Sequence, residues 1–290
     1  MTRLGLQVSK GVGLKMIRDP RAPLLPERDI HKIPVIECRA LCIQFGGLTA
    51  VDDFNMSIAP TEICGLIGPN GAGKTTIFNL LTKVYKPTSG AMFLNGKNTK
   101  HMNTTRAIRA GMARTFQNIR LFKELSVLDN VLVGLHNEMD YRLFGAVFRL
   151  PSYWRAEAIA RGRALDLLSI FNMQDDAEKK AGSLPYGSQR RLEIVRALAT
   201  NPAVLLLDEP AAGMNPSETV ELMENIRKIR DMFQIAILLI EHDMHLVMGV
   251  CEGVAVLNYG RLIAKGTPEE IQNNPLVIEA YLGVNSASLR

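Results

Sequence analysis

A glycine-rich segment near the first third of the chain has the composition of a phosphate-binding loop. It matches G-x-x-x-x-G-K-[ST], and its residues are Gly68, Pro69, Asn70, Gly71, Ala72, Gly73, Lys74 and Thr75, followed by Thr76. Glycines let the backbone wrap a phosphate closely, so that successive amides point inward. A lysine in this place reaches the outer phosphates of a nucleotide, and the threonine hydroxyl is suited to Mg²⁺. An apolar stretch precedes the loop and an amphipathic one follows, as a phosphate-binding loop requires.

Two adjacent carboxylates, Asp208 and Glu209, follow the apolar run 203–207. Such a run is typical of a buried parallel strand, whose carboxyl end opens on the ligand crevice. At that place Asp208 can hold the Mg²⁺ shell, while Glu209 can polarise an attacking water. Taken alone, the pair is equally consistent with a solvated acidic turn. Together with the phosphate loop, it predicts nucleotide hydrolysis.

The remaining pattern alternates strands with helices. Strand-like segments are 35–45, 51–58, 63–67, 203–207, 235–240 and 254–258, and helical ones are 73–84, 126–136, 155–171, 216–232 and 243–251. This alternation predicts an α/β core with a parallel sheet covered by helices. The stretch 118–184 lacks a convincing buried strand and reads as a helical insert. Residues 1–34 are rich in proline and predict a poorly ordered arm or a docked extension.

Composition excludes several classes of protein. The 290 residues are 47% hydrophobic and 22% charged, which fits a globular protein and excludes a disordered chain. The net charge of +5 indicates a solvated surface more than a nucleic-acid groove. The apolar run 235–240 is far shorter than the roughly 20 residues of a membrane span. The four cysteines form no C-x-x-C pair, so buried thiols are expected, and the N-terminus shows no apolar export signal.

From about residue 35 to residue 283 the chain resembles the nucleotide-binding subunit of ABC transporters. The resemblance implies an α/β P-loop NTPase (RecA-like) core, an antiparallel β subdomain and an inserted α-helical subdomain at about 118–184. Residues 1–34 would then be an N-terminal arm and residues 284–290 a tail. ATP and Mg²⁺ are the implied cofactors.

The same resemblance assigns roles to single residues. It implies that Gln117, in the family's Q-loop, senses Mg²⁺ and the attacking water, and that His242, in the H-loop, contacts the γ-phosphate. Residues 212–216 match the D-loop between two cassettes, and Phe45 stands where an aromatic ring stacks on adenine. Each residue alone has a plainer interpretation. Gln117 would be a loop amide, His242 a surface histidine or a metal ligand with His245, and Phe45 a core residue.

The segment 184–198 is similar to the family's signature motif but departs from its usual Leu-Ser-Gly-Gly-Gln opening. Pro185 replaces the serine, Tyr186 the first glycine and Ser188 the glutamine. The Gly187 amide, the Ser188 hydroxyl and the start of the following helix remain as anion donors, and Gln189 belongs to the same predicted set. We expect retained ATP clamping with altered catalysis at this face. Buried positions expected in the helix are Leu192, Val195, Leu198 and Ala199.

This departure, with segments 45–51, 210–216 and 278–283, is similar to the branched-chain amino acid uptake group. The implied partners are a second ATP-binding subunit (homologous or identical), two membrane permease subunits and, indirectly, a periplasmic substrate-binding protein, with no nucleic acid. The implied location is the cytoplasmic face of the inner membrane. Phe144, Val147 and Phe148 are candidate residues for docking to the permeases, and core packing is the alternative, and the more common, role for each. The alternatives are the same role for another amino acid, an amide or urea, or a soluble ABC ATPase; a GTPase is disfavoured because no Asn-Lys-x-Asp motif is present.

Overall fold

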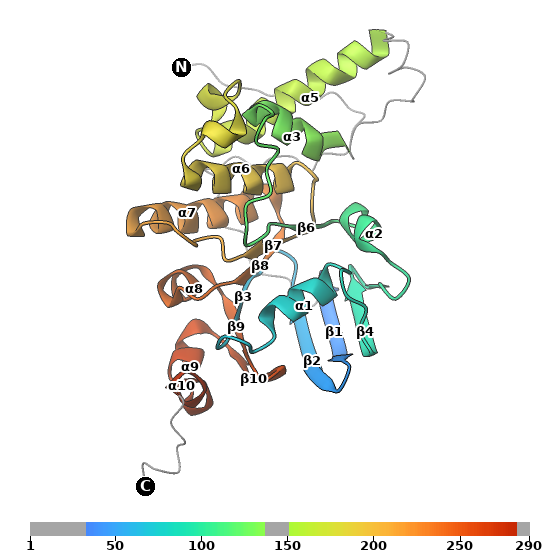
Figure 1. The fold of residues 1–290 in the computed structure, drawn as a ribbon, viewed down its shortest axis with the longest axis vertical. Coiled ribbons are helices and arrows are strands. Elements are labelled where there is room, and N and C mark those ends of the chain that lie inside the picture. Colours follow the sequence, from blue (N-terminus) through green and yellow to red (C-terminus); the bar gives the residue numbers. More distant parts are fainter. Residues whose placement is uncertain (1–32, 137–150, 283–290) are drawn as a thin grey trace.

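Two sheets organise the computed structural model, which describes residues 33–136 and 151–282 (Figure 1). The four-stranded antiparallel sheet has the order β2-β1-β4-β5. Its strands are β1 (Ile36–Phe45), β2 (Leu48–Ile58), β4 (Ser89–Leu94) and β5 (Lys97–Asn98).

The six-stranded sheet has the order β10-β9-β3-β8-β7-β6 and is parallel except for the β9–β10 pair. Its strands are β3 (Ile63–Ile67), β6 (Met112–Arg114), β7 (Val204–Asp208), β8 (Ala236–Ile240), β9 (Gly253–Asn258) and β10 (Arg261–Gly266).

Helices pack against the six-stranded sheet. They are α1 (Lys74–Leu81), α2 (Thr104–Arg109), α3 (Val127–Leu135), α5 (Pro151–Ile170), α6 (Tyr186–Leu198), α7 (Pro216–Phe233), α8 (Met244–Val250), α9 (Pro268–Gln272) and α10 (Pro275–Leu282), with 3₁₀ turns at Gln174–Asp176 and Ala181–Ser183. Of these, α3, α5 and α6 lie together at the top of Figure 1. None of these described helices is both long and apolar enough to cross a membrane.

The central strands are buried on both faces, and their side chains alternate between two cores. Leu66 and Leu206 face the core shared with α1 and the antiparallel sheet. Ile67 and Leu207 face the core shared with α3, α5, α6, α7 and α8. This alternation follows from the two-residue period of a strand and explains the uninterrupted apolar runs in the sequence.

Local capping fixes where the helices around the site begin. Asn215 and Glu218 form a reciprocal capping box at the start of α7, with Pro216 in the first turn. The Asp243 carboxylate accepts hydrogen bonds from the first amides of α8. Both caps follow strands of the parallel sheet, so the helices start beside the carboxyl ends of those strands.

The predicted fold class is confirmed, with differences in detail. The helix predicted over 73–84 ends at Leu81, because Lys83 takes a left-handed conformation (φ 61°). Val84, the last residue of the predicted range, is 54% exposed. Strands β4, β5, β6 and β10 were not predicted. Three cysteines are buried as expected, whereas Cys42 is only half-buried, with its Sγ 3.6 Å from an Asp52 carboxylate oxygen.

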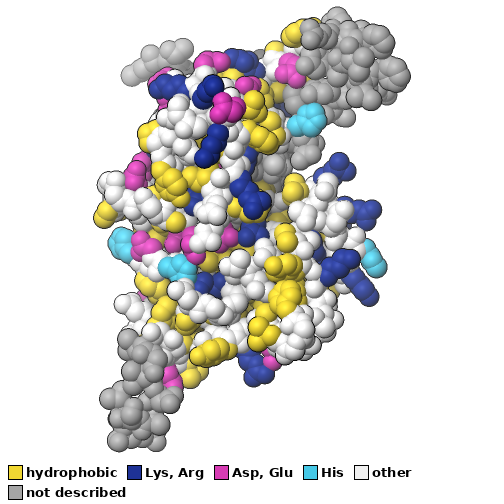
Figure 2. Space-filling view, viewed as in Figure 1, with side chains coloured by type: hydrophobic (Ala, Val, Ile, Leu, Met, Phe, Trp, Pro, Cys, Tyr) yellow, Lys and Arg dark blue, Asp and Glu magenta, His cyan; other side chains and the backbone are white. Residues whose placement is uncertain are grey.

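Lys and Arg side chains occupy several separate groups on the face shown in Figure 2, including one over α2. Residues 1–32 of the predicted arm 1–34, the tail at 284–290 and the candidate docking residues Phe144, Val147 and Phe148 lie outside the described residues. The predicted limits of the domain and of its helical insert stay predictions.

Candidate nucleotide-binding and catalytic site

The phosphate loop joins β3 to α1 and is fixed by close backbone contacts. Gly68 has φ 153°, and a Cβ there would lie 2.1 Å from the Leu257 carbonyl oxygen, so only glycine fits. The turn between β9 and β10, which contains Gly260, supports the loop from the other side. The Gly260 amide donates to the Ala72 carbonyl at 2.9 Å, while the Gly260 carbonyl accepts from the Asp52 amide at 2.9 Å. The loop is therefore held against both sheets before α1 begins.

Lys74 points back into the loop. Its ammonium donates to the carbonyl oxygens of Gly68 at 2.6 Å and of Pro69 at 2.9 Å, and the residue is only 6% exposed. Burial lowers the pKa of Lys74, and the negative charge of Glu209 partly opposes this effect. The charge is thus already desolvated, which strengthens its attraction for a phosphate in the loop.

Three predicted catalytic residues meet at one carboxylate. Gln117 donates through Nε2 to Oε2 of Glu209 at 2.8 Å, and Nε2 of His242 lies 2.8 Å from Oε1. Glu209 follows β7, Gln117 comes after the neighbouring β6, and His242 follows β8 on the other side. Parallel strands deliver their carboxyl ends to one edge of the sheet, which explains why segments far apart in sequence converge here.

Asp208, the last residue of β7, is almost fully buried and forms an ion pair with Arg114 at 2.8 Å. The other Arg114 nitrogen Nη1 donates to the side-chain oxygen of Asn79 at 2.8 Å. The predicted Mg²⁺ residues Thr75, Gln117 and Asp208 offer a hydroxyl, an amide and one carboxylate. Mg²⁺ in nucleotide sites takes few protein oxygens because phosphate and water supply the rest, so this donor set fits it. Within the described ranges no cluster of three or more His, Cys, Asp or Glu could itself hold a metal.

Phe45 lies at the end of β1 and is 45% exposed, so it is not a core residue. Its ring meets Tyr85 in an edge-to-face arrangement, with centroids 5.2 Å apart and planes at 73°. An exposed ring supported from its edge keeps a face available for stacking on a base. Sequence reasoning missed Tyr85, since it lies four residues beyond α1 and matches no motif.

Among the described residues, no side-chain hydrogen bond of the signature segment (184–198) reaches the phosphate loop. Gln189 donates to the Leu184 carbonyl at 2.8 Å, and Ser188 Oγ accepts from Arg191 at 3.1 Å. A Cβ on Gly187 would come within 2.9 Å of a Glu218 carboxylate oxygen at the start of α7. Pro185 occupies the N-cap of α6 and supplies no side-chain bond to it. The predicted buried stripe Leu192, Val195, Leu198 and Ala199 is confirmed.

Glu241 is a buried carboxylate that the sequence analysis did not single out. It accepts hydrogen bonds from the Ala211 amide at 2.8 Å and the His242 amide at 3.1 Å, and so ties the loop after β7 to the loop after β8. Burial raises the pKa of Glu241, while these amides act in the opposite direction. The sequence did contain one indication of this role, because Glu241 stands between the apolar run 235–240 and the predicted catalytic residue His242.

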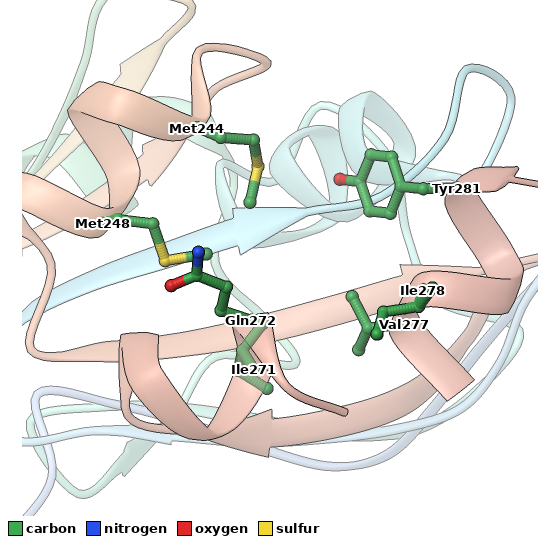
Figure 3. Close-up of a pocket in the computed structure, with 7 residues that line it drawn as sticks. All are labelled: Met244, Met248, Ile271, Gln272, Val277, Ile278 and Tyr281. Carbon is green, nitrogen blue, oxygen red and sulfur yellow. The ribbon is translucent and has the colours of Figure 1, made fainter. Parts of the chain in front are cut away.

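The C-terminal helix also reaches the site. Met244 and Met248 of α8, Ile271 and Gln272 of α9, and Val277, Ile278 and Tyr281 of α10 line an apolar pocket of about 410 Å³ (Figure 3). Burial raises the pKa of Tyr281, and a hydrogen bond with the backbone of Gly68 opposes that effect. The first glycine of the phosphate loop is thus in contact with α10.

Comparison with known proteins agrees with this geometry. Residues 51–212 match the ABC transporter family, and residues 261–287 match the branched-chain amino acid ATP-binding cassette transporter family. The chain is 48% identical to the high-affinity branched-chain amino acid transport ATP-binding protein LivG of Escherichia coli, over 86% of this chain and 98% of that protein. It is 45% identical to BraF, the similarly described protein of Pseudomonas aeruginosa, over the same shares.

Solved structures give the same result. A cassette of an ABC transporter in its ADP conformation aligns with a TM-score of 0.74 at 27% identity, over 87% of this chain and all of that one. A nucleotide-free ATP-binding cassette from an ABC transporter gives the same TM-score at 28% identity and the same coverage. The phosphate loop and the contacts of Gln117 and His242 with the Glu209 carboxylate agree with these similarities. The chain therefore belongs to the ABC transporter family as an ATP-binding, ATP-hydrolysing cassette.

Proposed function

We propose that the chain is the ATP-driven motor subunit of an importer for branched-chain amino acids, with Glu209 as the residue that activates water. The observation that carries the catalytic part is the bridging of the Glu209 carboxylate by Gln117 and His242, each at 2.8 Å. A carboxylate held at both oxygens is fixed in orientation, as a group that aligns water for attack must be.

The phosphate loop binds the triphosphate through the backbone of 68–73 and the Lys74 ammonium, with Thr75 and Thr76 at the start of α1. Phe45 stacks on the adenine, supported by Tyr85. Mg²⁺, held by Thr75 and Asp208 with Gln117 beside it, would neutralise charge on the phosphates. Lys74 and His242 supply further positive charge and hydrogen bonds where negative charge develops during transfer.

A second ATP-binding subunit completes each site. Gly187, Ser188 and Gln189 open α6, where backbone amides and the helix dipole favour an anion. Their described contacts are with α6, α7 and their own segment, which supports a role toward the nucleotide of another subunit. The second subunit is a homologous chain or a copy of this one.

The match at 261–287 and the names of the relatives LivG and BraF support branched-chain amino acids as the cargo. Two permease subunits dock near Gln117 and the helical insert at 118–184, and a periplasmic binding protein delivers the amino acid. The subunit is then peripheral, at the cytoplasmic face of the inner membrane, with residues 35–283 as its ATP-binding domain.

Uptake by the reconstituted transporter tests this proposal. The chain is co-purified with its permeases and second ATP-binding subunit, placed in proteoliposomes, and supplied with binding protein and labelled leucine, another amino acid, an amide or urea. ATP-dependent uptake of leucine is expected. Uptake of another compound instead would replace the cargo, and ATP hydrolysis without any permease association would replace the transport role.

A further inference from the structure

Arg190 is the largest fully buried side chain of the described residues. It lies in the second turn of α6, and its guanidinium is paired with Glu193, one turn later, at 3.1 Å. Glu193 is itself only 2% exposed. Burial removes the hydration of both ions, and this cost is large enough that a pair that only filled space could be replaced by apolar side chains without loss of stability. The remaining contacts of this pair indicate what it does.

Those contacts go to the backbone of the Q-loop. Arg190 donates to the carbonyl oxygen of Phe116 at 2.5 Å and to that of Gln117 at 2.6 Å. Glu193, the other member of the ion pair, accepts a hydrogen bond from the Arg120 amide through a carboxylate oxygen at 3.2 Å. The two charged side chains therefore hold the main chain on both sides of Gln117, with charge-assisted hydrogen bonds.

The Gln117 side chain is exposed and is held at its far end by the Glu209 carboxylate, 2.8 Å away. Its position on Glu209 depends on where its backbone is placed, and Arg190 is bonded to its carbonyl. Arg190 itself belongs to the signature segment, and the Tyr186 hydroxyl of that segment lies 3.5 Å from its Nη2.

We propose that Arg190 is a positioning residue for ATP hydrolysis: with Glu193 as its counter-ion, it sets the Q-loop so that Gln117 meets Glu209. This role rests on the proposed function of Glu209. The described hydrogen bonds of Arg190 go to Phe116, Gln117, Glu193 and Tyr186, so it acts on Glu209 through the backbone of Gln117. A residue in α6 thereby controls the geometry of a carboxylate at the end of β7.

The test uses Arg190→Met/Glu193→Gln, which removes both charges together and so leaves no unpaired buried ion. Steady-state ATP hydrolysis is measured on the reconstituted transporter. We expect kcat to fall roughly 10- to 100-fold while KM for ATP stays within about twofold, because displacement at the catalytic carboxylate affects turnover more than binding. Arg190→Lys keeps the charge but not the forked geometry, and gives an intermediate kcat.

A double-mutant comparison separates positioning from a general loss of structure. In a Gln117→Ala background, the Arg190→Met/Glu193→Gln change should lower kcat no further, because its route of action is already removed. An unchanged kcat in the wild-type background, or an equal further loss in the Gln117→Ala background, overturns the proposal. If the double variant does not fold, the same comparison is made with Arg190→Lys.

Arg230→Met/Glu252→Gln is the matched control. Arg230 and Glu252 form a partly buried pair at 2.7 Å between α7 and the segment that joins α8 to β9. This variant should keep kcat and KM. Glu209→Gln tests the proposed function separately from the role of Arg190. If Glu209→Gln retains turnover, the proposed function fails. If Glu209→Gln loses turnover but Arg190→Met/Glu193→Gln stays fully active, only the role of Arg190 is overturned.

Discussion

Nη2 of Arg114 lies 2.8 Å from Oδ2 of Asp208, joining the ends of the neighbouring strands β6 and β7 in a buried ion pair. The arginine is 10% and the aspartate 5% exposed, so neither charge has water to replace its partner. The pair therefore fixes the orientation of a carboxylate proposed to serve Mg²⁺.

Arg114→Met should lower the free energy of unfolding by about 3–5 kcal/mol, because it leaves the Asp208 charge buried without a partner. Urea denaturation of the wild type and the variant measures this difference. Arg114→Met/Asp208→Asn removes both charges and should recover much of the loss. A single variant as stable as the wild type would show that the ion pair does not stabilise the fold.

Glu209→Gln should abolish turnover while ATP binding persists. Glutamine keeps the size of the side chain but cannot accept a proton from water, and general base catalysis typically supplies about 10²–10⁴-fold in rate. Phosphate release measures turnover, and light scattering detects the ATP-bound dimer, which we expect to accumulate. Turnover at the wild-type rate would exclude Glu209 as the base.

Lys74→Ala should act on binding itself. The variant loses charge-assisted hydrogen bonds to phosphate worth about 1.5–3 kcal/mol, which corresponds to roughly 10- to 150-fold weaker affinity. Titration with a fluorescent ATP analogue gives the dissociation constant. Lys86→Ala, an exposed lysine beyond α1, is the control for loss of positive charge and should bind as the wild type does.

Phe45→Ala should weaken ATP binding without affecting the grip on phosphates. Stacking of a base on an aromatic ring is worth about 1–3 kcal/mol. Calorimetry with ATP and with inorganic tripolyphosphate separates the two contributions, since only ATP carries the base. Equal losses for both ligands would mean that Phe45 supports the loop instead of the adenine.

Glu241→Gln should change how stability depends on pH. Burial raises the folded-state pKa of Glu241 above its ordinary value of 4.5, so the folded protein keeps this proton at pH values where the unfolded chain has released it. Stability from this group is therefore lost as pH rises from the ordinary value through the raised one. Urea unfolding across that interval should show a decline in the wild type relative to the glutamine variant. A constant difference between the two proteins would contradict the raised pKa.

The sequence was sufficient to predict the elements with the strongest patterns. The runs 63–67, 203–207 and 235–240 are buried strands because both faces of the central sheet are covered, and the motifs after them meet at its edge. Gln117 and His242 were predicted by resemblance, and the structure brings both to Glu209.

Other features depend on tertiary contacts that no local pattern contains. Strand β6 has only three residues, too few for a periodicity. Arginine is usually a surface residue, and Arg114 and Arg190 are buried because partners distant in sequence surround them. Tyr85 supports the proposed adenine-stacking residue Phe45 because the end of β1 brings the Phe45 ring against it.

Gly260 belongs to no motif, yet a Cβ at this position would lie 2.5 Å from the Ala50 carbonyl oxygen. Its two hydrogen bonds join the phosphate loop to β2, and no side chain larger than hydrogen fits between them. Mutational tolerance at this turn is consequently governed by the fit of three backbone segments, so even a methyl group there would spread the segments apart. Descendants of this sequence can vary at Gly260 only if the strand carrying Ala50 shifts as well.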